Sequence, residues 1–553
     1  MNVIGQVLYY ANREEGTRLT KQTFIKGAMI LLAAGILNRI LGFIPRIALP
    51  RIIGAEGVGL YQLGYPFMIV LITIVTGGIP LAVAKWVAEA RSLGDREAEK
   101  KIFRTAMGLT VLLALLFTVA ALLLARWITT NVLPDSRVYY TFLCMIPILL
   151  IAAVSSVLRG YFQGRQNMIP TALSQTVETL VRIVFVLFFA YRLLPYGLEW
   201  AAAGAMLGVV TGELFGLGVL YWQFRTDQRR EALHAHNAPA LEHEHEPDAT
   251  PEAASPVEPT PETSALRKLL GLSIPVTGSR LVGSLSYLLE SIFIARSLAA
   301  AGIVTAIATA QYGALQGMII PIVLLPTALT YSLAVSLVPS LSEAAAKGDN
   351  ALIHKRLHQS MRLALVSGAP FAVIMYLFAE PICRILYNHV EIAPMLQMMA
   401  PIALFIYLQA PLQAALQALD KPGTALMNTF VGAAVKLVLI VQLASQPGLG
   451  IQGALIAINI NIVLVTLLHW IAVRRAVGFR MQMPDFAKVG GAMLIMGAAA
   501  LFLMNHLALP KEWHNLSLAC LLGMIVYLIL MVLMRVIDRH DVMRLPIVGK
   551  LFK

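Results

Sequence analysis

Nine charged side chains stand out because they lie inside long apolar runs, where a buried charge costs free energy and needs a partner or a task. Six of them are basic and three are acidic. They are Arg39, Arg46, Glu178, Arg182, Glu213, Arg280, Glu290, Arg296 and Lys436. Two neutral polar residues, Asn459 and Asn461, lie in a further apolar run. These positions are the candidates for chemistry within the apolar part of the protein.

Arg39, Arg46 and Arg280 are the candidates for binding an anion. Arg39 and Arg46 are seven residues apart, which places them on one helix face, and their run contains no acid. Arg280 precedes Glu290 by ten residues, about 15 Å along a helix axis. Arginines without an adjacent carboxylate are expected to face a water-filled cavity, where the guanidinium group suits phosphate. We therefore predict that these three arginines bind an anionic substrate.

Two alternatives stay open for these arginines. Glu290 could reach across from another helix and pair with Arg39 or Arg46. Arg46 and Arg296 could instead lie at the outer interface of the membrane and bind lipid headgroups.

The acids and the remaining basic residue are candidates for buried ion pairs or for ion coupling. Glu178 and Arg182 are four residues apart, so they share a helix face and can pair. Glu213, Glu290 and Lys436 have no charged neighbour at that spacing within their own runs. They are predicted to pair with charges on other helices or to take part in coupling.

The sequence carries no sign of catalysis. Phosphate-binding loops of the GxxxxGK[ST] type, GxSxG elbows and HExxH motifs are missing. His354 and His358 share a helix face in a predicted loop and are expected to be solvated. The three cysteines have no metal or redox spacing, and four further histidines occupy a Pro- and Glu-rich stretch. We predict a protein that is not an enzyme, with no cofactor and no metal site.

The elements that must position these residues are membrane-spanning helices. Of 553 residues, 58% are hydrophobic and 13% are charged, against about a quarter charged in a soluble protein. Apolar runs of about 20 residues span the hydrocarbon core. The sequence predicts an all-α integral membrane protein with about fourteen spans, near 25–49, 58–84, 105–126, 138–158, 170–190, 201–222, 269–296, 312–340, 362–382, 394–418, 424–445, 451–473, 489–508 and 515–534.

The distribution of basic residues predicts the orientation. If the N-terminus is cytoplasmic, the inside segments hold 31 of the 43 Lys and Arg residues and the outside loops hold six. The positive-inside rule then places both termini in the cytoplasm of a multi-pass protein of the cell membrane. The same rule accounts for the net charge of +13, so no nucleic acid partner is expected.

A repeat and a linker divide the chain. At an offset of 254 residues, landmarks coincide over four helices: Gly59 with Gly313, Gln62 with Gln316, and Arg182 with Lys436. Residues 226–265 lack apolar periodicity and are predicted to be a disordered cytoplasmic linker, with His234, His236, His243 and His245 solvated. We predict two parallel six-helix lobes, 1–225 and 266–475, followed by a C-terminal helix pair and basic tail at 476–553.

Several segments resemble a known family. They are GAEGVGLYQLGYP (54–66), TGGIPLAVAKWVAE (76–89), LRGYFQGRQNMIPTALSQTVETLVR (158–182) and PTALTYSLAVSLVPSLSEA (326–344). They resemble the polysaccharide-transporter branch of the multidrug/oligosaccharidyl-lipid/polysaccharide (MOP) exporter superfamily, in particular its sporulation proteins, which are akin to lipid II flippases. The resemblance implies a V-shaped carrier whose relatives flip undecaprenyl-diphosphate-linked sugars, including the peptidoglycan precursor lipid II. It also implies a cationic cavity, matched here by Arg39, Arg46 and Arg280, and a C-terminal helix pair that forms a groove for the lipid tail.

The leading hypothesis is a flippase for such a lipid-linked anionic glycan, serving spore cortex or cell-wall synthesis. Its expected partners are membrane lipids and cell-wall synthesis enzymes, and a monomer is expected. One alternative is a cation-coupled multidrug exporter, which would need buried carboxylates. Another is a non-transporting membrane scaffold for envelope assembly, in which the linker recruits partners.

Overall fold

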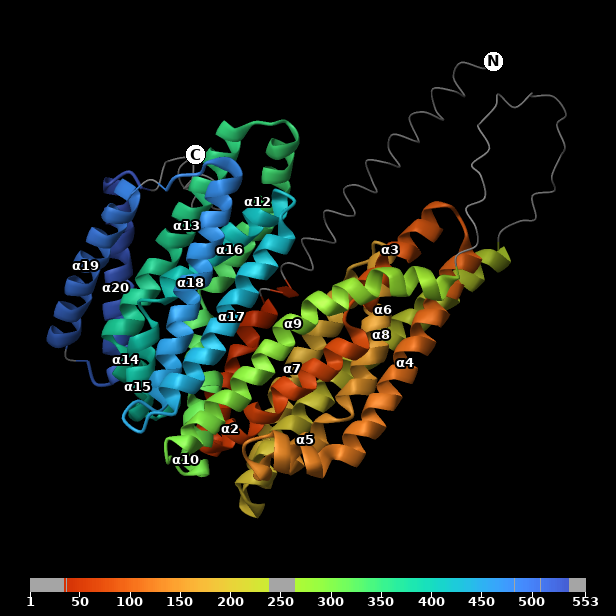
Figure 1. The fold of residues 1–553 in the computed structure, drawn as a ribbon, viewed down its shortest axis with the longest axis horizontal. Helices are drawn as coiled ribbons and strands as arrows, with labels where there is room; N and C mark the ends of the chain where they lie inside the picture. Colours follow the sequence, from red (N-terminus) through yellow and green to blue (C-terminus); the bar gives the residue numbers. More distant parts are fainter. Residues whose placement is uncertain (1–33, 36, 238–263, 482, 508, 537–553) are drawn as a thin grey trace.

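The computed structural model describes residues 34–35, 37–237, 264–481, 483–507 and 509–536, and every regular element in those ranges is a helix. Figure 1 shows two bundles of helices that converge at one end and diverge at the other. This arrangement confirms the predicted all-α, two-lobe, V-shaped fold. Helices are the expected element, because a helix satisfies its own backbone hydrogen bonds in an apolar medium.

The first half of the chain forms the bundle on the right of Figure 1. Its elements are α2 (Phe43–Thr76), α3 (Ile79–Ser92), α4 (Arg96–Trp127), η1 (Ile128–Val132), η2 (Ser136–Val138), α5 (Tyr139–Met145), α6 (Ile148–Gly164), α7 (Ile169–Leu193), η3 (Leu194–Tyr196) and α8 (Leu198–Asn237).

The second half forms most of the other bundle. Its elements are α9 (Ala265–Ala300), α10 (Thr305–Gly313), η4 (Ala314–Ile319), α11 (Ile320–Leu324), α12 (Thr327–Ala346), α13 (Asn350–Leu377), α14 (Ala379–Tyr387), η5 (Val390–Ile392), α15 (Ala393–Met399), α16 (Ala403–Ala418), α17 (Pro422–Ala444) and α18 (Ile451–Val477). The C-terminal pair, α19 (Met483–His506) and α20 (Glu512–Leu533), packs against α13 at the outer edge of this bundle.

The predicted count of fourteen spans is not confirmed. Within the described residues, eleven helices are long and apolar enough to cross a membrane, or twelve if a bent pair counts as one span. That pair consists of Val390–Met399 and Ala403–Ala418. One reason for the lower count is the stretch Leu37–Ser92, which is helical over 56 residues and includes two predicted spans. Gly54, at φ +66°, interrupts it where the prediction places the outside turn.

The repeat is visible in the positions of the helix breaks. The bounds of η5 lie 254 residues after those of η2, the bounds of α15 lie 254 after those of α5, and α16 ends 254 residues after α6. The helices that follow, α7 with α17 and α8 with α18, begin within one residue of the same offset. The two halves therefore fold by the same pattern, as the sequence predicts.

Matching caps begin the equivalent helices α4 and α13. The side chains of Asp95 and Asp349 each accept a hydrogen bond from the backbone N–H three residues later, at 2.8 and 2.9 Å. Gly94 and Gly348 precede them at φ +73° and +65°, a conformation that favours glycine. An N-cap acid satisfies a backbone donor that has no intrahelical partner, so each cap fixes where its helix begins.

The two bundles meet where the repeat-related glycines face each other. A Cβ on Gly59 would lie 2.0 Å from the carbonyl oxygen of Thr309, and one on Gly313 would lie 2.2 Å from that of Ala55. The backbones of α2 and α10 therefore touch at this crossing. A two-fold axis brings equivalent residues together, so this crossing lies on the pseudo-symmetry axis.

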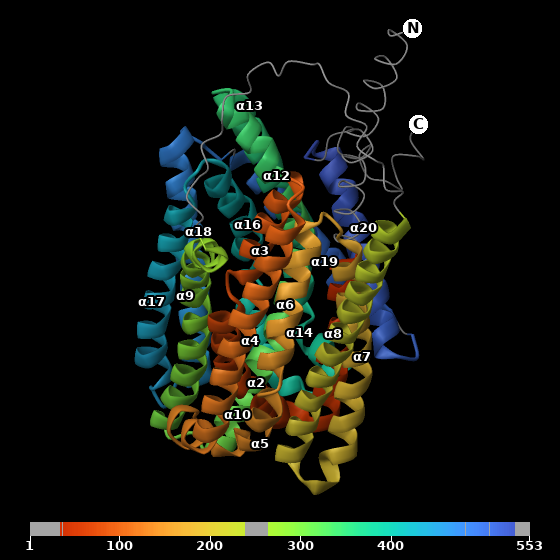
Figure 2. The same ribbon diagram turned by 90° about the vertical axis from the view of Figure 1, so that its right-hand side faces the viewer.

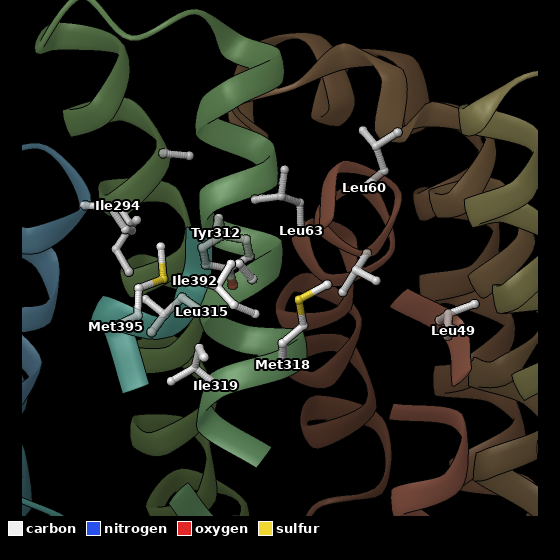
Figure 3. Packing of buried hydrophobic residues seen from close by; sticks show 14 of the residues in the cluster. Leu49, Leu60, Leu63, Ile294, Tyr312, Leu315, Met318, Ile319, Ile392 and Met395 are labelled. Atoms are coloured by element: carbon white, nitrogen blue, oxygen red, sulfur yellow. The ribbon is translucent and has the colours of Figure 1, made fainter. Parts of the chain in front are cut away.

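Buried apolar side chains surround the crossing. Figure 3 labels Leu60 and Leu63 from α2, Tyr312 from α10, and Leu315, Met318 and Ile319 from η4. All six are completely buried. The core at this end of the molecule is thus shared by the two halves.

The first helix of the second half runs along the first half as well. Figure 2 shows α9 between α17 on one side and α4 on the other, and α9 packs against both of them and against α2 and α3. Parts of the predicted linker are helical instead, since residues 226–237 continue α8 and residue 265 begins α9. The rest of it, 238–263, lies outside the described residues, as do His243, His245 and the basic tail at 537–553.

Candidate functional site

Arg46 lies between the two halves of the protein. Its side chain is exposed, and among the described residues it makes no hydrogen bond or ion pair. Its charge acts on tyrosines from both halves, namely Tyr61 and Tyr65 of α2, Tyr287 of α9 and Tyr387 of α14. Arg46 is therefore a cation whose electrostatic field reaches tyrosines of both halves.

Arg39 and Arg280 extend this region along two helices. Arg39 is exposed and lies seven residues before Arg46. Arg280 is exposed and lies seven residues before Tyr287 on α9. Seven residues are about two helical turns, or roughly 10 Å on the same face. The geometry is thus compatible with a row of three cations between the lobes.

Arg280 is also tied to the first half of the chain. Its Nη1 donates a hydrogen bond of 2.6 Å to the carbonyl oxygen of Gly77, which ends α2. Beside it, the hydroxyl of Thr277 accepts a hydrogen bond of 2.9 Å from the backbone N–H of Gly78. A Cβ on Gly78 would lie 2.4 Å from the carbonyl oxygen of Ser273, so glycine is required for this close approach. Arg280 can use its other donors for a ligand.

Glu178 is the centre of a buried charge cluster in the first lobe. It is 7% exposed, and its carboxylate lies 2.9 Å from Nη2 of Arg159 and 3.3 Å from Nη1 of Arg182. Glu213 of α8 interacts electrostatically with all three groups. Two cations and two acidic side chains thus gather where α7 packs on α8.

The prediction identified three members of this cluster but missed Arg159. Arg159 directly follows the predicted span 138–158, so the sequence predicts that it lies in a cytoplasmic loop. In the structure it belongs to α6, and a tight turn brings α7 back beside it. The sequence does contain one indication of this contact. Arg159 precedes Glu178 by 19 residues, which places the two on adjoining helices of a hairpin.

Glu290 pairs with Lys436 in the second lobe. Oε2 of Glu290 forms an ion pair with Nζ of Lys436, and Oε1 accepts a hydrogen bond of 3.2 Å from Nε2 of Gln316. The carboxylate is 7% exposed. The suggested pairing of Glu290 with Arg39 or Arg46 is therefore wrong, because a cation on α17 occupies the carboxylate. Gln316 was not foreseen as its partner.

Arg296 and Asn459, two further residues identified in the sequence, bind backbone carbonyls. Arg296 donates to the carbonyl oxygen of Asn131 at 2.8 Å, and Asn459 donates to that of Met398 at 3.0 Å. Asn461 keeps a buried side-chain oxygen without a hydrogen-bond partner in the described residues.

His354 and His358, which are predicted to be solvated, are half-buried instead. Nε2 of His354 lies 2.6 Å from the carbonyl oxygen of Val477, and Nε2 of His358 lies 3.0 Å from Asp485. They join α13 to the end of α18 and to the first turn of α19. Nowhere in the described ranges do three His, Cys, Asp or Glu side chains form a possible metal site.

Known proteins with related sequences identify the family. The signature of the family described as "Polysaccharide biosynthesis protein" matches residues 24–343, and that of MatE matches residues 284–441. Stage V sporulation protein B of Bacillus subtilis (strain 168) is 39% identical over 534 residues, which cover 96% of this chain and 99% of that protein. Lipid II flippase MurJ of the same organism is 26% identical over 471 residues, covering 82% of this chain and 83% of that protein.

Solved structures share the fold. A lipid II flippase MurJ in an inward closed conformation superposes with a TM-score of 0.66 at 16% identity, covering 92% of this chain and 99% of that one. An inward-facing multidrug resistance MATE family transporter of the MOP superfamily gives 0.58 at 17% identity, covering 82% and 98%.

The activities named for these relatives are flipping and transport, in agreement with the prediction that this protein is not an enzyme. The relatives and the many apolar helices also identify a multi-pass membrane protein. The chain belongs to the polysaccharide biosynthesis protein family, in the polysaccharide-transporter branch of the MOP exporter superfamily.

Proposed function

We propose that this protein is a flippase for an undecaprenyl-diphosphate-linked oligosaccharide, with the peptidoglycan precursor lipid II as its substrate. The observation that carries the proposal is Arg46, an exposed cation between the lobes that no carboxylate of the described residues neutralises. The sequence relationship to a lipid II flippase and to a stage V sporulation protein supports the substrate class. A role in spore cortex or cell-wall synthesis is part of the same proposal.

The cavity arginines would offset the cost of moving a diphosphate out of water. Arg39, Arg46 and Arg280 supply guanidinium forks that match phosphate oxygens. The tyrosine hydroxyls near Arg46 can donate hydrogen bonds to sugar and phosphate oxygens. The polyprenyl tail would stay in lipid, and the helix pair α19 and α20 would guide it.

The opening is proposed to face the cytoplasm. The helices diverge on the side where α8 ends and α9 begins (Figure 1). The segments that we predict to be cytoplasmic on that side contain 31 of the 43 Lys and Arg residues. This conformation would then accept substrate from the inner leaflet, and rocking of the lobes would present the headgroup outside.

The buried ion pairs are proposed to hold each lobe rigid while the lobes move. Glu178 with Arg159 joins α7 to α6, and Glu290 with Lys436 joins α9 to α17. Glu213 is the remaining acid that could take up a proton during turnover. In a multidrug exporter the buried carboxylates would have to attract a cation, and here Glu178 and Glu290 already have cationic partners. The geometry therefore favours an anionic cargo.

The test is a flipping assay with purified protein in liposomes that contain fluorescently labelled lipid II. We expect Arg46→Ala to slow flipping about tenfold or more, because a charge-assisted hydrogen bond contributes about 1.5–3 kcal/mol. Arg280→Ala and Arg39→Ala should each slow it as well. Arg126→Ala, which removes an exposed arginine at the end of α4, is the matched control. Wild-type rates in all three cavity variants would refute the assignment.

A further inference from the structure

Each half of the chain carries a pair of backbone carbonyls at its narrow end, opposite the opening. In the first half they belong to Asn131 and Val132, at the end of η1. In the second half they belong to Ile385 and Leu386, near the end of α14. The two pairs are related by the 254-residue offset. Carbonyls in the last turn of a helix have no intrahelical partner and need a donor from elsewhere.

Arg51 supplies that donor to the second half. It lies on α2, just before the break at Gly54. Its Nε donates to the carbonyl oxygen of Leu386 at 2.7 Å, and its Nη2 donates to that of Ile385. Two donors on one edge of the guanidinium group are therefore used, and the two bonds connect residues 335 and 334 positions apart in the chain.

Arg296 supplies the donor to the first half. It lies near the end of α9, and its Nη2 donates to the carbonyl oxygens of Asn131 at 2.8 Å and Val132 at 3.5 Å. One nitrogen thus serves both acceptors. The acceptors match those of Arg51 under the repeat. The two arginines do not match each other, because the same offset relates Arg51 to Thr305 and Arg296 to Gly42.

We propose that Arg51 and Arg296 are paired gate residues that hold the outer ends of the lobes together in the inward-open state. This inference rests on the proposed transport function, because a gate matters only if the lobes rock. Each arginine reaches from one half of the chain to the other. A cation at the C-terminal end of a helix is also favoured by the helix dipole. When the outer ends separate, both contacts must break.

A third polar contact crosses at the same end. Oγ1 of Thr309 on α10 donates to Oδ2 of Asp135 at 2.8 Å, and this carboxylate is only 3% exposed. Arg137 also binds Asp135 at 2.8 Å and reaches Glu56 at 2.6 Å. The arginine contacts to carbonyls are insensitive to pH, because neither an arginine nor a carbonyl titrates in the physiological range. The gate is therefore closed mainly by contacts that do not depend on protonation.

The gate can be tested by spin-label distance measurements on the full-length protein in lipid nanodiscs without substrate. Labels at Tyr196→Cys and Gln446→Cys, after replacement of Cys144, Cys383 and Cys520, report on the exposed outer turns of the two lobes. We expect a short distance in the parent protein. Arg51→Ala and Arg296→Ala should each increase the long-distance population about tenfold, as loss of a charge-assisted hydrogen bond predicts, and the double variant should increase it further.

Lysine substitutions separate a gate from general damage to the fold. Lysine offers one nitrogen, so Arg296→Lys should keep the short distance, whereas Arg51→Lys should not. Arg126→Ala should leave the distance unchanged. An unchanged distance in the Arg51→Ala, Arg296→Ala double variant overturns the gate, whether or not the protein flips lipid II. A parent protein that flips no lipid II but whose distances respond as expected overturns the proposed function and leaves the gate intact.

Discussion

Replacing Gly59 by alanine should push the outer ends of the lobes apart. Gly59 and Gly313 form the backbone contact between α2 and α10 on the pseudo-symmetry axis. A Cβ on Gly59 would lie 2.0 Å from the carbonyl oxygen of Thr309 and 2.7 Å from its Cγ2. The oxygen belongs to the backbone of the opposing helix, so a change of side-chain rotamer cannot relieve this clash.

The size of the effect follows from these distances. Non-bonded heavy atoms prefer a separation of about 3.5 Å or more, so the helices must move apart by roughly 1.5 Å at the crossing. Forcing an additional carbon into a packed contact costs about 1–3 kcal/mol. A penalty of that size changes a two-state equilibrium about 5- to 150-fold. The ratio of molecules with a closed outer end to molecules with an open outer end should fall by the same factor.

Spin-label distances between the outer turns measure this population directly, and thermal unfolding in detergent measures the cost to the fold. Gly313→Ala should act similarly, because its Cβ would lie 2.2 Å from the carbonyl oxygen of Ala55. Gly218→Ala is the matched control, since an added Cβ there meets no atom within 4 Å. The control should be neutral or slightly stabilising, because alanine favours a helix over glycine by up to about 1 kcal/mol.

The reasoning fails if Gly59→Ala behaves like Gly218→Ala in both measurements. It also fails if Gly59→Ala shortens the distance between the outer turns, because the clash can only separate the two helices. A lower melting temperature with an unchanged distance would mean that the crossing stabilises each lobe and not the contact between them.

Three further predictions follow from the structure. Lys436→Met should lower the free energy of unfolding by about 3–5 kcal/mol, because it leaves the carboxylate of Glu290 buried and unpaired. Adding Glu290→Gln should restore part of this loss, and thermal melts of the two variants measure the difference. Burial alone would raise the pKa of Asp135, but hydrogen bonds from Arg137 and Thr309 outweigh it and lower the pKa. The contact between this carboxylate and Thr309 should therefore persist above about pH 4 and weaken only as the pH falls through the lowered pKa. Distances between the outer turns should accordingly stay constant from about pH 5 to 8. Deleting residues 239–262 should leave flipping in liposomes intact, whereas complete loss of flipping would favour a scaffold role for that segment.

The sequence is sufficient to predict the class of fold and its internal symmetry. Long apolar runs require helices, since a helix satisfies its own backbone within lipid. The match of Gly59 with Gly313 pointed to a repeat, and the structure brings these two glycines into contact. Caps such as Asp95 and Asp349 are encoded locally, because a side chain bonds to the backbone three residues away.

The sequence also predicts which residues are candidates for a site, but only some of their partners. Glu178 and Arg182 share a helix, so their spacing predicts their contact. Glu290 meets Lys436 across 146 residues, and Arg159 meets Glu178 from another helix. These pairings depend on how neighbouring helices rotate and pack, and hydropathy does not encode that rotation.

The tertiary structure alone decided what the remaining arginines do. The sequence places Arg280 and Arg296 in one apolar run and predicts an anion site for the first and the outer interface for the second, but it gives no protein partner for either. The packing of α9 against the first half directs Arg280 to the end of α2 and Arg296 to the end of η1. Arg51 lies between two predicted spans, 25–49 and 58–84, yet in the structure it binds two carbonyls more than 330 residues away. Composition and spacing determine which charges enter the membrane, whereas their partners depend on contacts between distant helices that form only when the two halves pack together.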